Sequence, residues 1–179
     1  MSAEERRLWW RHLISFLLAP VTMAIVIPAS IVNWPNIHGP DLGSPLRAGL
    51  VIIGGLLIFV GLCLLIWTVL LFDREGKATL GVGKVMAEPV NLVVRGPYRH
   101  VRNPMITGLL CILLGEAAAL DSGKLLVWFA VFFACIASFI RFWEEPHLAE
   151  RYGSAYLDYR GNVPRWIPRI AAWAPTSTG

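Results

Sequence analysis

A short polar stretch, RGPYRHVRNP, begins at position 95 and carries residue types that could bind a charged small molecule. A phenol, an imidazole, a guanidinium and an amide follow one another closely, in Tyr98, His100, Arg102 and Asn103. Asn is a favoured helix N-cap and Pro a favoured first helical residue, so a helix should begin at Pro104. The simpler interpretation is a basic border at a membrane surface, with Tyr98 as its aromatic anchor.

An acidic pair is the second feature that could do chemistry. Glu144 and Glu145 follow an apolar run without charged residues, from Leu125 to Ile140, and Arg141 lies one helical turn or less before them. Carboxylates bind ammonium groups or ribose hydroxyls, and a guanidinium binds a carboxylate. The two stretches together suit a ligand that is zwitterionic, aromatic and cationic.

Four apolar runs must position these residues, and they cover 13–32, 48–72, 104–120 and 125–140. A bilayer needs roughly 20 apolar residues of helix, and the last run reaches that length only if Phe142 and Trp143 form its interfacial end. With 56% hydrophobic residues, the chain is too apolar for an ordinary soluble domain. We predict an all-α, polytopic membrane helix bundle with about four transmembrane helices.

The last two apolar runs should form a hairpin, because only DSGK at 121–124 separates them. Helices joined by so short a turn pack antiparallel. The start of one, at Asn103 and Pro104, should then lie beside the end of the other, at Arg141 to Glu145. The two polar stretches are therefore expected to form one site, to which a helix N-terminus adds unpaired N–H groups.

The basic residues predict which side of the membrane this site faces. Fourteen of the sixteen Lys and Arg residues lie before position 13, in the loop 73–103 or after position 140. The positive-inside bias predicts an inner-membrane or plasma-membrane protein with both termini and the site in the cytoplasm. A signal peptide is an alternative for the first run, because arginines precede it. We attribute the net charge of +4 to pairing with anionic lipid, not with nucleic acid.

Both stretches, with the tail HLAERYGSAYLDYRGNVPRWIP, resemble the integral-membrane methyltransferases: isoprenylcysteine carboxyl methyltransferase and its relatives, and the phospholipid N-methyltransferases. The resemblance covers residues 72–170 and depends on an R-[HN]-P element, the Glu pair and a Y-G-x-x-Y-x-x-Y tail. It implies S-adenosylmethionine as methyl donor. It assigns cofactor binding to Tyr98, Arg102, Asn103, Pro104, Glu144 and Glu145. It also associates Arg141 with the substrate or the cofactor carboxylate.

The resemblance implies an N-terminal two-span membrane region at 1–71 and a methyltransferase-like region at 72–179. The expected acceptor is a lipophilic small molecule or lipid that enters from the bilayer. A carboxylate acceptor would need no base, whereas an amine or thiol would, and His100 is placed for that role. The isoprenylcysteine enzymes usually carry His and Tyr where this chain has Asn103 and Ile106, so their prenyl specificity is not implied.

Two other functions fit the same residues. One is a membrane reductase that uses a nicotinamide cofactor, since sterol reductases share a related C-terminal element. The other is a membrane scaffold or transporter component, which would bind no cofactor. We expect no metal site, because Cys63, Cys111 and Cys135 lie within apolar runs and lack ligand spacing.

Three further features allow more than one interpretation. Glu116, within the third apolar run, is either functional or a carboxyl group that is protonated or bonded to a neighbouring helix. The glycine-rich stretch at 76–83 lacks the glycines of a Walker motif, and we predict a loop there. The aromatic residues of the tail predict an interfacial helix on the membrane surface, or a lid packed over the helices at 104–120 and 125–140; they are Tyr152, Tyr156, Tyr159 and Trp166.

Overall fold

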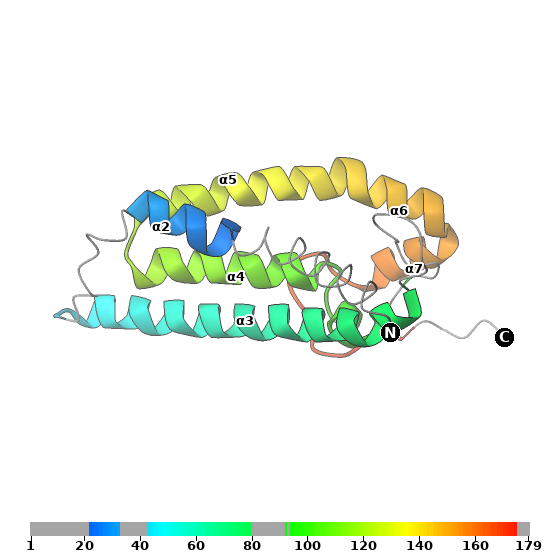
Figure 1. Cartoon of the computed structure of the whole chain (residues 1–179), viewed down its shortest axis with the longest axis horizontal. Coiled ribbons are helices and arrows are strands. Elements are labelled where there is room, and N and C mark those ends of the chain that lie inside the picture. Colours follow the sequence, from blue (N-terminus) through cyan, green and yellow to red (C-terminus); the bar gives the residue numbers. More distant parts are fainter. Residues whose placement is uncertain (1–21, 33–42, 80–91, 93, 175–179) are drawn as a thin grey trace, which may run out of the picture. The chain divides into compact units, whose positions relative to one another are not determined.

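The described part of the chain, in a computed structural model, comprises residues 22–32, 43–79, 92 and 94–174, with the backbone alone for 72–79. Every regular element in these ranges is helical (Figure 1), so the predicted all-α fold is confirmed. The elements are η1 (Thr22–Val26), α2 (Ile27–Val32), α3 (Pro45–Thr79), η3 (Gly96–Arg99), α4 (Pro104–Ala119), α5 (Gly123–Phe139), η4 (Ile140–Glu144), α6 (Glu145–Tyr152) and α7 (Ser154–Asn162).

Two helical runs are long and apolar enough to cross a membrane. They are Pro45–Leu71 in α3 and Gly123–Tyr152, which passes through α5, η4 and α6. The runs Thr22–Val32 and Pro104–Ala119 are apolar but shorter. The count of four spans stays a prediction, and residues 13–21 of the first predicted span lie outside the described residues.

The surface of α3 is consistent with lipid surroundings. Large apolar side chains such as Ile52, Leu56 and Phe59 are more than half exposed along it. A contiguous exposed apolar surface is unfavourable in water and favourable against acyl chains.

Helix α3 continues to Thr79, so the loop predicted from residue 73 is wrong over 73–79. Residues 73–79 are Asp, Arg, Glu, Gly, Lys, Ala and Thr. Only Gly76 disfavours a helix markedly, by about 1 kcal/mol, and a single glycine does not end one. The charges mark the end of the apolar surface, not the end of the helix. The rest of the glycine-rich stretch, 80–83, lies outside the described residues.

The chain divides into two compact units. Unit 1 comprises Met1–Ile58 and Ile112–Phe129, and unit 2 comprises Phe59–Cys111 and Ala130–Gly179. Helices α3, α4 and α5 each contribute residues to both. This division does not test the predicted boundary between 71 and 72, which stays a prediction.

Unit 1 contains the predicted hairpin turn. Helix α4 ends at Ala119 and α5 begins at Gly123, which confirms a short turn at this place. Asp121 in the turn has φ of 46°, in the left-handed region that Asp tolerates better than most residues. Its carboxylate lies 3.6 Å from the guanidinium of Arg47, at the start of α3.

Helices α3 and α4 approach to backbone contact within unit 1. A Cβ added to Gly54 would lie 2.6 Å from the carbonyl oxygen of Gly115, and a Cβ added to Gly115 would lie 2.6 Å from that of Gly54. No other residue type fits at either position without moving a helix backbone. Glycine therefore sets the distance between these two helices.

Candidate active site

The polar stretch before α4 turns sharply and then starts the helix. Gly96 has φ of +52° and begins the 3-10 turn of η3, in which Pro97 is buried. The carbonyl oxygen of Asn103 accepts the N–H of Thr107 at 2.9 Å, which makes Asn103 the N-cap residue. Helix α4 begins at Pro104, so the predicted start of this helix is confirmed.

The acidic pair lies at the end of a π-turn, η4, where Glu144 is the last residue of the turn and Glu145 the first of α6. The cause of the turn is visible in the sequence. Pro146 has no N–H and its ring would collide with the carbonyl group four residues earlier, so a regular α-helix is disfavoured here. The N–H of Glu145 instead bonds the carbonyl of Ile140, five residues back. Such wide turns occur frequently at functional sites.

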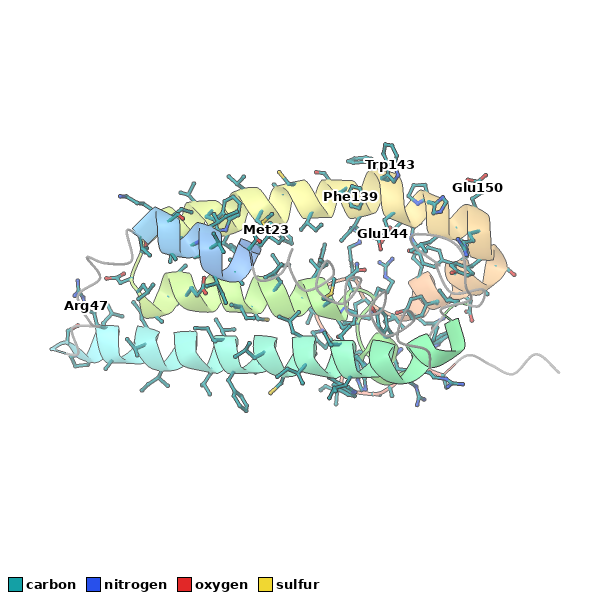
Figure 2. The ribbon with its side chains drawn as sticks, viewed as in Figure 1. Met23, Arg47, Phe139, Trp143, Glu144 and Glu150 are labelled. Atoms are coloured by element: carbon teal, nitrogen blue, oxygen red, sulfur yellow. The ribbon has the colours of Figure 1, made fainter. Side chains whose placement is uncertain are left out.

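The π-turn separates exposed side chains from partly or fully buried ones. Trp143 is 73% exposed, whereas Glu144 is half-buried and Glu145 is buried. Figure 2 shows the side chains of Trp143 and Glu144 on opposite sides of the helix. The two acids therefore occupy different environments although they are adjacent in the sequence.

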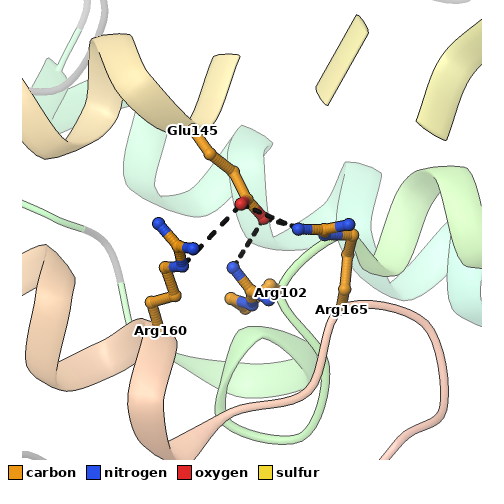
Figure 3. Close-up of polar contacts among 4 residues, drawn as sticks. All are labelled: Arg102, Glu145, Arg160 and Arg165. Carbon is orange, nitrogen blue, oxygen red and sulfur yellow. Dashed lines mark hydrogen bonds and ion pairs between the residues drawn. The ribbon is translucent and has the colours of Figure 1, made fainter. Parts of the chain in front are cut away.

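Three arginines surround the carboxylate of Glu145 (Figure 3). Arg102 donates from Nη1 to Oε1 at 2.6 Å, and Arg165 donates from Nε and Nη2 to the two oxygens, each at 2.8 Å. Arg160 lies further away, with its Nε 3.8 Å from Oε2. The side chain of Glu145 is only 4% exposed, so its charge is neutralised inside the protein.

One hydrogen-bond donor of Arg102 is unpaired among the described residues. Its side chain is 11% exposed, and its Nε atom is buried without a hydrogen-bond partner in the part of the chain that the structure describes. A buried charged donor that lacks an acceptor is unfavourable. An anionic group of a ligand would supply that acceptor.

The tail after α7 is hydrogen-bonded to the polar stretch along its length. The N–H of Arg102 donates to the carbonyl of Pro164, that of Arg169 to His100, and that of Trp173 to Arg99, each at 2.9 Å. The ring Nδ1 of His100 also lies 2.8 Å from the carbonyl oxygen of Arg169. The tail therefore fixes the backbone of the polar stretch, to which His100 and Arg102 belong.

The tyrosines of the tail are core residues of unit 2. Tyr156 and Tyr159 on α7 are buried together with Val163. The hydroxyl of Tyr159 donates to the carbonyl of Tyr98 at 2.8 Å. The partly buried neighbours of this cluster include Leu148 and Ala149 of α6 and Trp173. These contacts test neither the interfacial helix nor the lid over the helices at 104–120 and 125–140, so both stay predictions.

Burial raises the pKa of three tyrosines of unit 2. It raises the pKa of Tyr98 well above the ordinary value, and the negative charge of Glu144 raises it further. Burial likewise raises the pKa of Tyr159 and of Tyr156. Each of these hydroxyls is therefore a hydrogen-bond donor at neutral pH.

The structure unites most of the residues that the sequence singled out. Arg102 contacts Glu145, and Tyr98 lies close enough to Glu144 to be affected by its charge. His100 is held by the tail. The side chain of Arg141 is exposed, and no hydrogen bond or ion pair involves it among the described residues.

Two arginines of the site were not predicted. Arg160 and Arg165 counted in the sequence only as cytosolic charges, yet both lie at Glu145. A signal was present, because a buried carboxylate needs cations and the tail after the acidic pair is rich in arginine. Nothing in the sequence identified which of the two acids would be buried.

Glu116 belongs to unit 1 and is half-buried, with Oε2 buried and unpaired within the described ranges. In those same ranges no three His, Cys, Asp or Glu side chains are grouped so that they could hold a metal ion. The site of unit 2 is therefore built from carboxylates, guanidiniums, phenols and an imidazole.

Comparison with known proteins identifies the family. A search of curated proteins found no match to the chain, and a search of solved structures found none either. The family described as phospholipid methyltransferase matches residues 50–155, which include α4, α5, the polar stretch and both acids. The chain belongs to the phospholipid methyltransferase family.

Proposed function

We propose that this protein transfers a methyl group from S-adenosylmethionine to a lipophilic acceptor in the membrane. Membership of the family makes it a methyltransferase for lipid-like membrane substrates. The observation that carries the more specific proposal is the contact of Arg102 with Glu145. It joins the two polar stretches, 43 residues apart in the sequence, at the ends of apolar helices.

The residues present fit the charges of the proposed cofactor. We propose that Glu144 binds a cationic or hydroxyl group of the cofactor, because Glu145 is already enclosed by arginines. The unpaired Nε of Arg102 suits a carboxylate. Tyr98, Asn103 and Pro104 would complete the binding loop at the start of α4. When bound, the cofactor supplies an electrophilic methyl group on a sulfonium.

Alignment and exclusion of water are what the protein must provide. Charge disperses when a methyl group leaves a sulfonium, so orientation of the acceptor contributes most of the rate. The apolar helices and the buried tyrosine cluster keep the surroundings dry. Arg141, exposed at the π-turn, is proposed to bind an anionic group of the acceptor or the cofactor.

His100 is the proposed base for an amine or thiol acceptor. If Nδ1 donates to the carbonyl of Arg169, then Nε2 of the neutral ring is the acceptor of a proton. The hydrogen bond therefore selects the tautomer that a base requires. A carboxylate acceptor would not need this group.

The site and both termini are proposed to lie on the cytosolic side, following the distribution of Lys and Arg. A reporter that is active only in the cytosol, fused after Gly179, should give signal. Signal from a reporter that works only outside the cytosol would overturn this orientation.

Transfer of labelled methyl groups tests the activity. Purified protein in detergent is mixed with a lipid extract and S-adenosylmethionine that carries a labelled methyl group. Label is expected in the lipid fraction, and Glu144→Gln should reduce the amount. An unlabelled lipid fraction from several membrane sources, with folded protein, would contradict the proposal.

A further inference from the structure

We infer that Arg165 and Glu145 are positioning residues, which hold Arg102 in the orientation that binds the cofactor carboxylate. The inference rests on the proposed function and goes beyond it, because Arg165 was not among the expected site residues. It also gives Glu145 a role different from that of Glu144.

Glu145 is badly suited to bind a cationic ligand directly. Arg165 forms a two-point fork on its carboxylate, and Arg102 adds a short hydrogen bond of 2.6 Å. Arg160 contributes a third positive charge nearby. A single negative charge among three positive ones attracts a further cation weakly. The buried carboxylate instead fixes the arginines.

Arg102 has a buried donor that lacks a partner among the described residues. Nη1 is bound to Glu145, its backbone N–H is bound to Pro164, and its buried Nε has no partner among the described residues. An arginine binds a carboxylate well only when its planar guanidinium is held at the correct angle. Glu145 provides that restraint from one side.

Arg165 can orient Glu145 because its own backbone is held firmly. The preceding residue, Pro164, accepts the N–H of Arg102. The ring of the following residue, Trp166, packs edge-on against Phe133 at 5.5 Å between centroids. With both neighbours fixed, the fork of Arg165 determines the orientation of the carboxylate, and the carboxylate determines that of Arg102.

The affinities for two ligands distinguish a positioning role of Arg165 from a general structural role. S-adenosylhomocysteine carries the amino-acid carboxylate, whereas 5′-methylthioadenosine lacks the amino-acid part. Calorimetry in detergent would compare their dissociation constants for the wild type, Arg165→Gln and Arg165→Lys. Arg151→Gln is the matched control, since Arg151 is exposed on α6 and stacks on Tyr152.

The wild type should prefer S-adenosylhomocysteine by about ten- to hundredfold, the usual effect of a charge-assisted hydrogen bond. Arg165→Gln should reduce this preference about fivefold or more, with binding of methylthioadenosine unchanged. Arg165→Lys should act in the same direction, because lysine lacks the fork, and it replaces the Gln variant if that one does not fold. Arg151→Gln should keep the wild-type preference.

A preference that stays at the wild-type level in both Arg165 variants would overturn the inference. So would an equal loss of affinity for both ligands, since that is the result of a general structural role. A wild-type protein that binds neither ligand would overturn the proposed function itself. Failure of the proposed function would therefore be detected with the wild-type protein, before any variant is tested.

Discussion

The two units of the chain share one kind of internal contact and differ in another. In both units α3 and α4 approach closely at glycine: at Gly54 and Gly115 in unit 1, and in unit 2 at Gly108, where an added Cβ would lie 2.8 Å from the carbonyl oxygen of Gly61. In unit 2, a buried glutamate surrounded by arginines and a tyrosine cluster are the prominent features. Unit 2 therefore adds to the glycine contact a cluster of buried charges that compensate one another.

The largest effect should follow from Glu145→Gln. Removing one partner of a buried ion pair leaves uncompensated charge and costs about 3–5 kcal/mol. We therefore expect a clear fall in the melting temperature in detergent. Glu144→Gln should lower the melting temperature less, because the side chain of Glu144 is only half-buried, while it weakens cofactor affinity about ten- to hundredfold.

Equal stability losses in the two glutamine variants would remove the distinction between the acids. Unchanged cofactor affinity in Glu144→Gln would mean that Glu144 does not bind the cofactor.

The glycine contact of unit 1 should respond to size and not to charge. Gly54→Ala places a methyl group against the backbone of α4, and overpacking of this kind costs about 1–3 kcal/mol. Gly55→Ala is the matched control, because nothing lies within 4 Å of the added Cβ. Thermal unfolding in detergent should show a loss for the first variant only. Similar melting temperatures for both would show that the helix contact is not close in solution.

Arg141→Lys should lower the efficiency of methyl transfer about tenfold, or about 1.4 kcal/mol in transition-state stabilisation. Lysine preserves the charge but not the planar fork. The protein should insert and purify normally, because Arg141 is exposed. Wild-type kcat/KM in this variant would mean that the only role of Arg141 is to orient the protein in the membrane.

The smallest effect is expected at the tyrosine cluster. Tyr159→Phe removes the hydrogen bond to the carbonyl of Tyr98 and should cost about 1 kcal/mol. Its effect should also depend on pH. The folded-state pKa of Tyr159 is raised above the unfolded value of about 10, so its contribution is fully present below that pH and is lost as pH rises further.

Thermal unfolding between neutral pH and pH 11 would measure this dependence. The wild type should lose stability above about pH 10, and Tyr159→Phe should lose less over the same interval. Parallel curves would indicate that the hydroxyl is not buried as the structure has it.

The helices and the pairing of the two polar stretches were predictable because they depend on local rules. Pro104 after Asn103 marks a helix start, and a turn of a few residues forces the hairpin that brings Arg102 to Glu145. The extension of α3 to Thr79 is not predicted by hydropathy, because the change from apolar to charged residues at position 73 does not end the helix.

The arginines of the tail could not be assigned in advance. Arg160 and Arg165 reach Glu145 only because the chain folds back after α7 and Pro164 bonds to Arg102. Long-range backbone pairing of this kind leaves no periodic pattern in the sequence. The π-turn is different, because Pro146 marks its place in the sequence, although Pro146 does not indicate which of the two acids is buried.

Binding of S-adenosylhomocysteine to the purified wild-type protein tests the central claim most directly. Titration calorimetry in detergent should be performed side by side with NADPH. The account predicts saturable binding of S-adenosylhomocysteine by the wild type, weaker binding by Glu144→Gln, and no binding of NADPH. Binding of NADPH instead, or no heat from S-adenosylhomocysteine with folded protein, would contradict a methyltransferase site in unit 2.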